Sequence, residues 1–123
     1  MRVKDAVGRF GERLAADHLV AAGLTIIATN WRCPSGEIDI IAQDGPVLVF
    51  VEVKTRSTLA FGDPAEAVGP AKAARIRALA LRWIGERREA EPGEYWDQLR
   101  FDVISVLRRG ADGPTVTHLP AAF

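Results

Sequence analysis

One stretch of the chain, residues 36–56, constrains its fold more than any other: GEIDIIAQDGPVLVFVEVKTR. It holds two runs of strand-forming residues joined at Asp44-Gly45, a pair typical of hairpin turns, and so predicts two antiparallel strands. Three charged residues interrupt the apolar runs: Asp39, Glu52 and Lys54. Burying such groups without partners costs on the order of several kcal/mol each, so something must compensate for them.

The rest of the chain adds two helices and three strands to this hairpin. Apolar residues at helical spacing predict helices at residues 3–22 and 70–88. Short β-branched or apolar runs predict strands at 24–30, 37–43, 47–55, 99–107 and 115–119. The glycine- and proline-containing residues 57–69 are expected to form a loop. The order α-β-β-β-α-β-β predicts an α/β fold with a mixed sheet flanked by helices.

Two glycines, Gly8 and Gly11, are unusual inside the first predicted helix. Each costs about 1 kcal/mol relative to alanine in a helix interior. Close approach of another backbone is one explanation for their presence.

The composition indicates one ordinary globular domain spanning residues 1–123. Sixteen basic residues balance sixteen acidic ones, which argues weakly against strong non-specific DNA binding but says nothing about a local basic patch. The single cysteine, Cys33, excludes an internal disulfide, and with only two histidines the chain is poor in zinc ligands. No apolar run approaches the length of a membrane span, and no signal peptide is visible, so a cytoplasmic location is expected.

The charged residues of the hairpin form a candidate site. Alternate residues of a strand face the same side, so Glu52 and Lys54 are neighbours, and Asp39 lies beside them if the register allows. A divalent cation held between the two carboxylates, with the lysine next to it, would compensate the buried charge. The alternatives are a surface pair on an edge strand for Glu52 and Lys54, and a strand-end acid for Asp39. The mostly apolar character of residues 47–55 favours a central strand.

These residues also resemble a known signature. Asp39, followed after twelve residues by Glu52-Val53-Lys54, resembles the D…(D/E)xK pattern of the PD-(D/E)xK nuclease superfamily, which includes restriction endonucleases and archaeal Holliday junction resolvases. Longer segments resemble the YraN-like family of small bacterial proteins regarded as endonuclease-like: GRFGERLAADHL (8–19), GEIDIIA (36–42), FVEVKTR (50–56), FGDPAEAV (61–68), Lys72 with Arg75, and RFDVI (100–104). This resemblance covers almost the whole chain.

The resemblance implies a restriction endonuclease-like α-β-β-β-α-β core and a metal-dependent nuclease site. Asp39 and Glu52 would bind Mg²⁺ or Mn²⁺, Lys54 would be the catalytic lysine, and Glu12 on the first helix would complete the ligand set. An exposed helical glutamate is the alternative for Glu12. Ile38 stands where the superfamily name has proline, a position that varies within the superfamily.

Several other charged residues have alternative roles. Glu37 is an additional acid, either a ligand or a peripheral strand-end residue, and Arg56 either contacts a phosphate or caps its strand. Lys72 and Arg75 share a helix face and, with Arg9, Arg13 and Arg32, would form a phosphate-binding surface; a solvated helix face is the alternative. Asp102 is expected to be a structural partner for a nearby arginine. The three tryptophans are expected to lie in the core or at an interface: Trp31, Trp83 and Trp96.

Three functions are therefore considered. The leading hypothesis is an endonuclease acting on branched or single-stranded DNA through phosphate contacts, since no sequence-reading motif is visible. One such site cuts one strand, so a symmetrical cut of a duplex would require a homodimer. The alternatives are a non-catalytic nucleic-acid-binding or adaptor domain that retains the fold, and a protein-interaction partner with no nucleic-acid contact.

Overall fold

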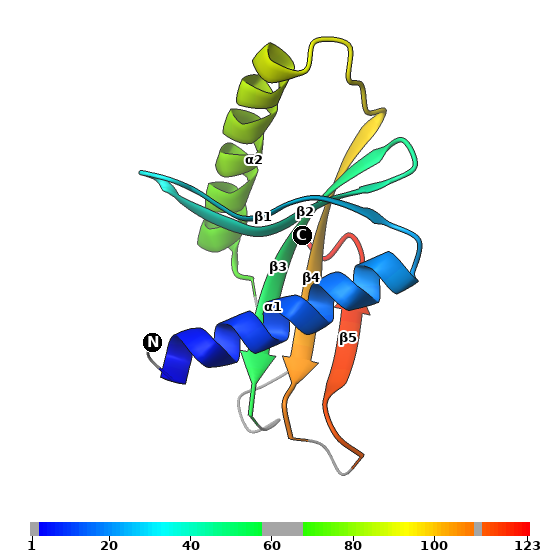
Figure 1. Cartoon of the computed structure of the whole chain (residues 1–123). Coiled ribbons are helices and arrows are strands. Elements are labelled where there is room, and N and C mark those ends of the chain that lie inside the picture. The colour runs from blue at the N-terminus through cyan, green and yellow to red at the C-terminus, as the bar shows by residue number, and fades with distance from the viewer. Residues whose placement is uncertain (1–2, 58–67, 110–111) are drawn as a thin grey trace.

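A computed structural model describes residues 3–57, 68–109 and 112–123. Two helices and five strands follow the predicted order (Figure 1): α1 (Val3–Ala21), β1 (Thr25–Cys33), β2 (Gly36–Asp44), β3 (Val47–Arg56), α2 (Pro70–Ala90), β4 (Gln98–Leu107) and β5 (Thr115–Leu119). The predicted elements are confirmed to within a few residues, and β1 runs three residues further than expected. The predicted loop at 57–69 and the motif at 61–68 lie almost wholly outside the described residues.

The strands form one mixed sheet in the order β1-β2-β3-β4-β5, with α1 on one face and α2 on the other (Figure 1). Only β3 and β4 are parallel; the other neighbours are antiparallel. Parallel neighbours need a long crossover, and α2 lies within this one. The expected α/β fold with a central third strand is confirmed. Neither helix among the described residues is long and apolar enough to cross a membrane.

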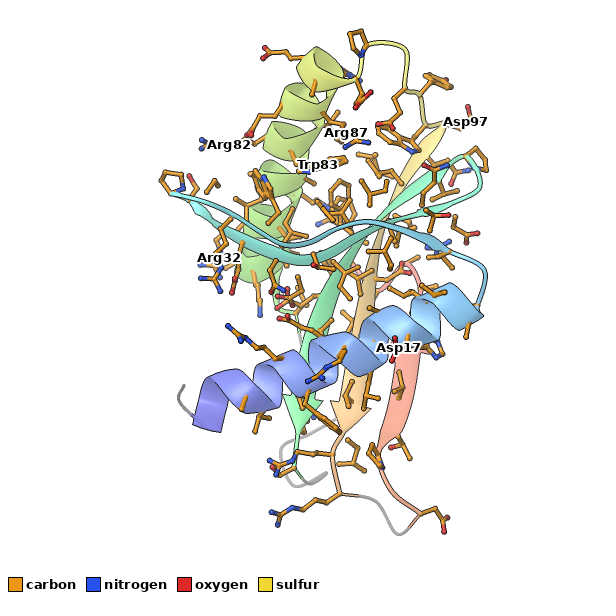
Figure 2. All side chains as sticks on the ribbon, viewed as in Figure 1. Asp17, Arg32, Arg82, Trp83, Arg87 and Asp97 are labelled. Atoms are coloured by element: carbon orange, nitrogen blue, oxygen red, sulfur yellow. The ribbon has the colours of Figure 1, made fainter. Side chains whose placement is uncertain are left out.

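Alternation along β3 gives each helix its own core. Val49 and Val51 face α1, where they join Ala15 and Leu19 in one cluster. Leu48 and Phe50 face α2 and pack with residues that include Trp83, which Figure 2 shows projecting from α2 toward the strands. Trp31 and Trp96 pack at the edge of the same cluster, so the expected core role of the three tryptophans is confirmed.

The β2–β3 pairing stops before either strand ends. Its last paired residues are Ile40 and Val51, although β2 begins at Gly36 and β3 continues to Arg56. The β1–β2 hairpin stays paired as far as its turn, where Gly36 lies against Leu79 of α2. β2 therefore separates from β3, leaving a fork between the two strands at the centre of the sheet.

Asp102 is fully buried in β4, and all of its observed contacts are structural. Arg100 donates two hydrogen bonds to its carboxylate, at 2.9 and 3.0 Å. His118 Nε2 lies 2.8 Å from Oδ2, and the backbone N–H of Ala121 donates to Oδ1 at 3.0 Å. The expected role as a structural partner for arginine is confirmed, and the same contacts tie the C-terminal segment to β4.

Gly11 allows α1 to lie close to β3. A methyl group at this position would overlap Oγ1 of Thr55 and lie 2.9 Å from its Cβ. The expectation of a close backbone is thus wrong, because the near neighbour is a side chain. At Gly8, no atom of the described residues lies within 4 Å of such a methyl group, so close packing within that part of the chain does not explain this glycine.

The two glycines should respond in opposite ways to alanine. Gly11→Ala should destabilise the protein by about 1–3 kcal/mol, because the β-branched Thr55 cannot easily rotate away from the new methyl group. Gly8→Ala should stabilise it by about 0.5–1 kcal/mol through helix propensity alone. Urea denaturation of both variants tests this, and equal shifts in the same direction would contradict the packing shown for Gly11.

Candidate functional site

The candidate site lies at the fork, where Asp39 bridges the separated strands. Its Oδ2 accepts a hydrogen bond of 2.8 Å from the backbone N–H of Val53. Val53 follows Glu52 in β3, and this bond holds the Asp39 carboxylate close enough to Glu52 for the charge of Glu52 to help raise the pKa of Asp39. The carboxylate takes the place of the β2 backbone that would otherwise accept from this N–H. The structure thus brings Asp39 and Glu52 together, while Lys54 lies two residues after Glu52 on the same strand.

Glu12 reaches the same place from α1 with the help of Asn30. The β1–β2 register pairs Thr29 with Ile40 and Trp31 with Ile38, which leaves Asn30 opposite Asp39. Asn30 has a φ of 52°, a left-handed conformation that asparagine tolerates better than most residues. Its side chain hydrogen-bonds the half-buried Glu12 carboxylate. Glu12 therefore lies close enough to Asp39 to affect its pKa, and Asn30 contacts it there.

Negative charge accumulates at the fork. Burial raises the pKa of Asp39 to about 7; the nearby Glu52, and then Glu12 and Glu37, add to the rise, and the Val53 N–H opposes it. Burial also raises the pKa of Glu12, against the hydrogen bond from Asn30. The acids are close enough for Asp39 to respond to Glu52, Glu12 and Glu37, and for Glu12 to respond to Glu37 and Glu52. Such an arrangement favours binding of a proton or a cation.

Lys72 already supplies one cation. Its Nζ forms an ion pair with Oε1 of Glu52, whose side chain is only 14% exposed. The sequence suggested a phosphate-binding role for Lys72 on the surface of α2, whereas the structure places its ammonium group inside the candidate site. Arg75 and Lys54 are exposed, and Arg56 is half-buried near the end of β3.

Glu37 lies at the edge of the site. It is exposed and forms an ion pair with Arg32 at 3.1 Å across the β1–β2 hairpin. Figure 2 shows Arg32 at this part of the hairpin, between the two helices in the view. Glu37 and Glu12 also line a cleft of about 750 Å³ on the α1 side of the fork, whereas Asp39 and Glu52 lie outside its walls.

The donor types suit a hard divalent cation. Carboxylate oxygens are what Mg²⁺ and Mn²⁺ prefer, and a cation here would offset the burial and the repulsion from Glu52 that raise the pKa of Asp39. In the part of the chain that the structure describes, no three His, Cys, Asp or Glu side chains are already grouped as ligands. The Lys72 ammonium group would have to move away from Glu52 before both oxygens of that carboxylate could bind a metal ion.

Asn30 is the site residue that the sequence analysis missed. Asparagine is depleted in strands, so its position within the β-branched first strand was a usable signal. Its partnership with Glu12 was not readable, because it depends on the hairpin register and on the approach of α1.

Comparisons with known proteins agree on one family. A family model described as "Uncharacterised protein family UPF0102" matches residues 11–106. Proteins named "UPF0102 protein" from Acidothermus cellulolyticus and Beutenbergia cavernae are 50% and 53% identical, covering 98% and 97% of this chain and 95% and 97% of their own lengths. A relative from Frankia casuarinae is 51% identical over the whole of both chains. None of these names states an activity.

Asp39 should make stability depend on pH. Its folded-state pKa of about 7 lies above the ordinary value of 3.8, so the folded protein holds this proton more tightly than the unfolded chain does. The resulting stabilisation is fully present below pH 3.8 and is lost as the pH rises to about 7. Asp39→Asn keeps an acceptor for Val53 and should flatten this part of the curve. Urea denaturation at several pH values measures it.

The matched control is Asp17→Asn, which makes the same change at an exposed residue of α1. Its stability curve should follow that of the wild type. If Asp39→Asn also follows the wild type, the account of charge at the fork is wrong.

Lys72 should compete with a bound cation. Lys72→Met keeps the aliphatic stem but frees Glu52, so Mn²⁺ should bind about two- to fivefold more tightly, as expected for an ion pair worth up to about 1 kcal/mol. Electron paramagnetic resonance of free Mn²⁺ measures this directly. Arg75→Met, on the same helix but exposed, should leave the affinity unchanged; weaker binding in Lys72→Met would contradict the competition.

Proposed function

We propose that this chain, which belongs to the uncharacterised protein family UPF0102, is a metal-dependent endonuclease of the PD-(D/E)xK type. The observation that carries the proposal is the Asp39–Val53 hydrogen bond, which holds one carboxylate near Glu52, two residues before Lys54 on β3. The spacing of these residues matches the nuclease signature, and the fold is consistent with a restriction endonuclease-like core.

Each residue has a distinct proposed role. Asp39 and Glu52 would hold Mg²⁺ or Mn²⁺, and Glu12, oriented by Asn30, would complete the ligand set. When bound, the cation would polarise a phosphoryl oxygen and lower the pKa of a water molecule. Lys54, exposed next to these acids, would orient the attacking water or stabilise negative charge on the phosphate.

The proposed substrate is DNA, either branched or single-stranded. The chain carries no recognisable sequence-reading motif, so phosphate contacts would determine binding. Arg56 and Arg75 are the expected contacts from β3 and α2. A symmetrical cut across two strands would require two sites, and hence a homodimer.

A second candidate function is a nucleic-acid-binding or adaptor domain without catalysis. The ion pair between Lys72 and Glu52 favours it, because a cation of the protein itself already neutralises the acid. Such a domain would bind nucleic acid in the presence of EDTA and would cleave nothing in Mn²⁺.

The nuclease proposal predicts cleavage that depends on three side chains. With Mn²⁺, the wild type should cut at least one member of a panel of labelled single-stranded, flapped and four-way-junction DNAs. Asp39→Asn, Glu52→Gln and Lys54→Ala should each lower the rate by about 10²–10³-fold, the usual effect of removing one group that stabilises transition-state charge. Gel electrophoresis of the products measures the rates.

The control is Arg82→Ala, an exposed residue on α2 that Figure 2 shows directed away from α1. It should cleave as the wild type does. Activity that persists in Lys54→Ala would mark a contaminating nuclease and refute the assignment.

A further inference from the structure

The cleft beside the fork has one wall from α1 and one from the β1–β2 hairpin. The α1 wall presents Gly8, Arg9, Glu12, Arg13 and Ala16, which share one helix face. The hairpin wall presents Thr29, Asn30, Arg32 and Glu37. With a volume of about 750 Å³, the cleft is within the usual range for ligand sites. Gly8 and Ala16 have small side chains or none, so they leave room in the cleft along α1.

Two of the three arginines are available to a ligand. Arg9 and Arg13 are exposed and four residues apart on α1, and no ion pair joins either to any other residue in the described ranges. Some other arginines are engaged in ion pairs, as Arg82 is with Glu86 and Arg87 with Glu94. Two free guanidinium groups on one wall are suited to successive phosphates of a strand.

The other residues that line the cleft indicate which parts of a ligand it could contact. Among the residues that the structure describes, no aromatic side chain lines the cleft, so these walls offer no platform for base stacking, the usual source of affinity for exposed bases. Thr29 and Asn30 add polar groups, and Glu12 connects the cleft to the acids of the fork, since Glu52 and Arg32 both act on its carboxylate. A ligand bound to the arginines would therefore lie next to the candidate metal site.

We propose that the cleft between α1 and the β1–β2 hairpin binds a single strand of nucleic acid through its phosphates, with Arg9 and Arg13 as the main contacts and Arg32 at the far wall. A single strand bends into a concave space between two walls, whereas a duplex is stiff over its whole length. Recognition by phosphates makes the binding tolerant of sequence. The suggestion that the bound strand is cut at the fork rests on the proposed nuclease function, whereas binding of the strand in the cleft does not depend on that function.

The test is binding of a labelled dT15 strand to the full chain, followed by fluorescence anisotropy in EDTA, where no metal-dependent cleavage occurs. Arg9→Ala/Arg13→Ala should weaken binding about tenfold or more at low salt. Removing two phosphate contacts should also lower the slope of log Kd against log salt by about 1.4, since each contact on a single strand contributes about 0.7. Circular dichroism checks that each variant is folded.

Two further variants separate specific contacts from general charge. Arg82→Ala/Arg88→Ala removes the same formal charge from exposed positions on α2 and should bind as the wild type does. Arg9→Lys/Arg13→Lys keeps the charge and should retain most of the affinity. Equal loss in the two alanine variants would overturn the proposal, as would a wild type that fails to bind at low salt.

Two competitors test the ligand class. A duplex of the same length should compete less well than dT15, and equal competition would overturn the single-strand assignment. An rU15 strand should bind within about threefold of dT15, because phosphates are common to both. The binding assay contains no metal, so it is independent of the cleavage assay in Mn²⁺. A wild type that binds the strand in EDTA but cleaves no DNA in Mn²⁺ would support the cleft proposal and refute the nuclease proposal.

Discussion

The structure depends on the separation of β2 from β3 after the Ile40–Val51 pair. Beyond it, the β1–β2 hairpin packs toward α2 while β3 continues beside α1, so each helix covers its own core. The separation would leave the backbone N–H of Val53 without a strand partner, and a buried N–H without an acceptor costs about 1–3 kcal/mol. The Asp39 carboxylate accepts from it instead. The Asp39 side chain thus provides the hydrogen-bond acceptor that the Val53 N–H lacks, and it places a carboxylate at the centre of the fork.

Placing Asp39 at the fork adds to the negative charge of the neighbouring glutamates, and the protein's own cations and donors neutralise only part of that charge. Lys72 neutralises Glu52, Arg32 pairs with Glu37, and Asn30 donates to Glu12. From the described residues Asp39 receives only the backbone N–H of Val53, and burial raises its pKa to about 7. The basic cleft lies directly beside these acids. An acidic centre next to free arginines is the arrangement that a cation and a phosphate together would complete.

Local sequence signals predicted most of the fold. β-branched runs and the Asp44-Gly45 turn defined the strands, and valine alternation placed β3 at the centre of the sheet. The position of Asp39 next to Glu52 was anticipated only subject to register, because the end of the β2–β3 pairing is set by packing of the hairpin on α2. The contacts of Asn30 and Lys72 were not predictable, since both join elements distant in sequence. The same is true of the Gly11–Thr55 contact.

The central claim is that the carboxylates at the fork form a cation site. The most direct measurement is calorimetric titration of Mn²⁺ at pH 8, above the Asp39 pKa of about 7, into the wild type and a folded Asp39→Asn/Glu52→Gln variant. The account predicts binding to the wild type that the variant loses. Equal binding to both proteins, or no binding to the wild type even with a non-cleavable DNA strand present, would contradict it.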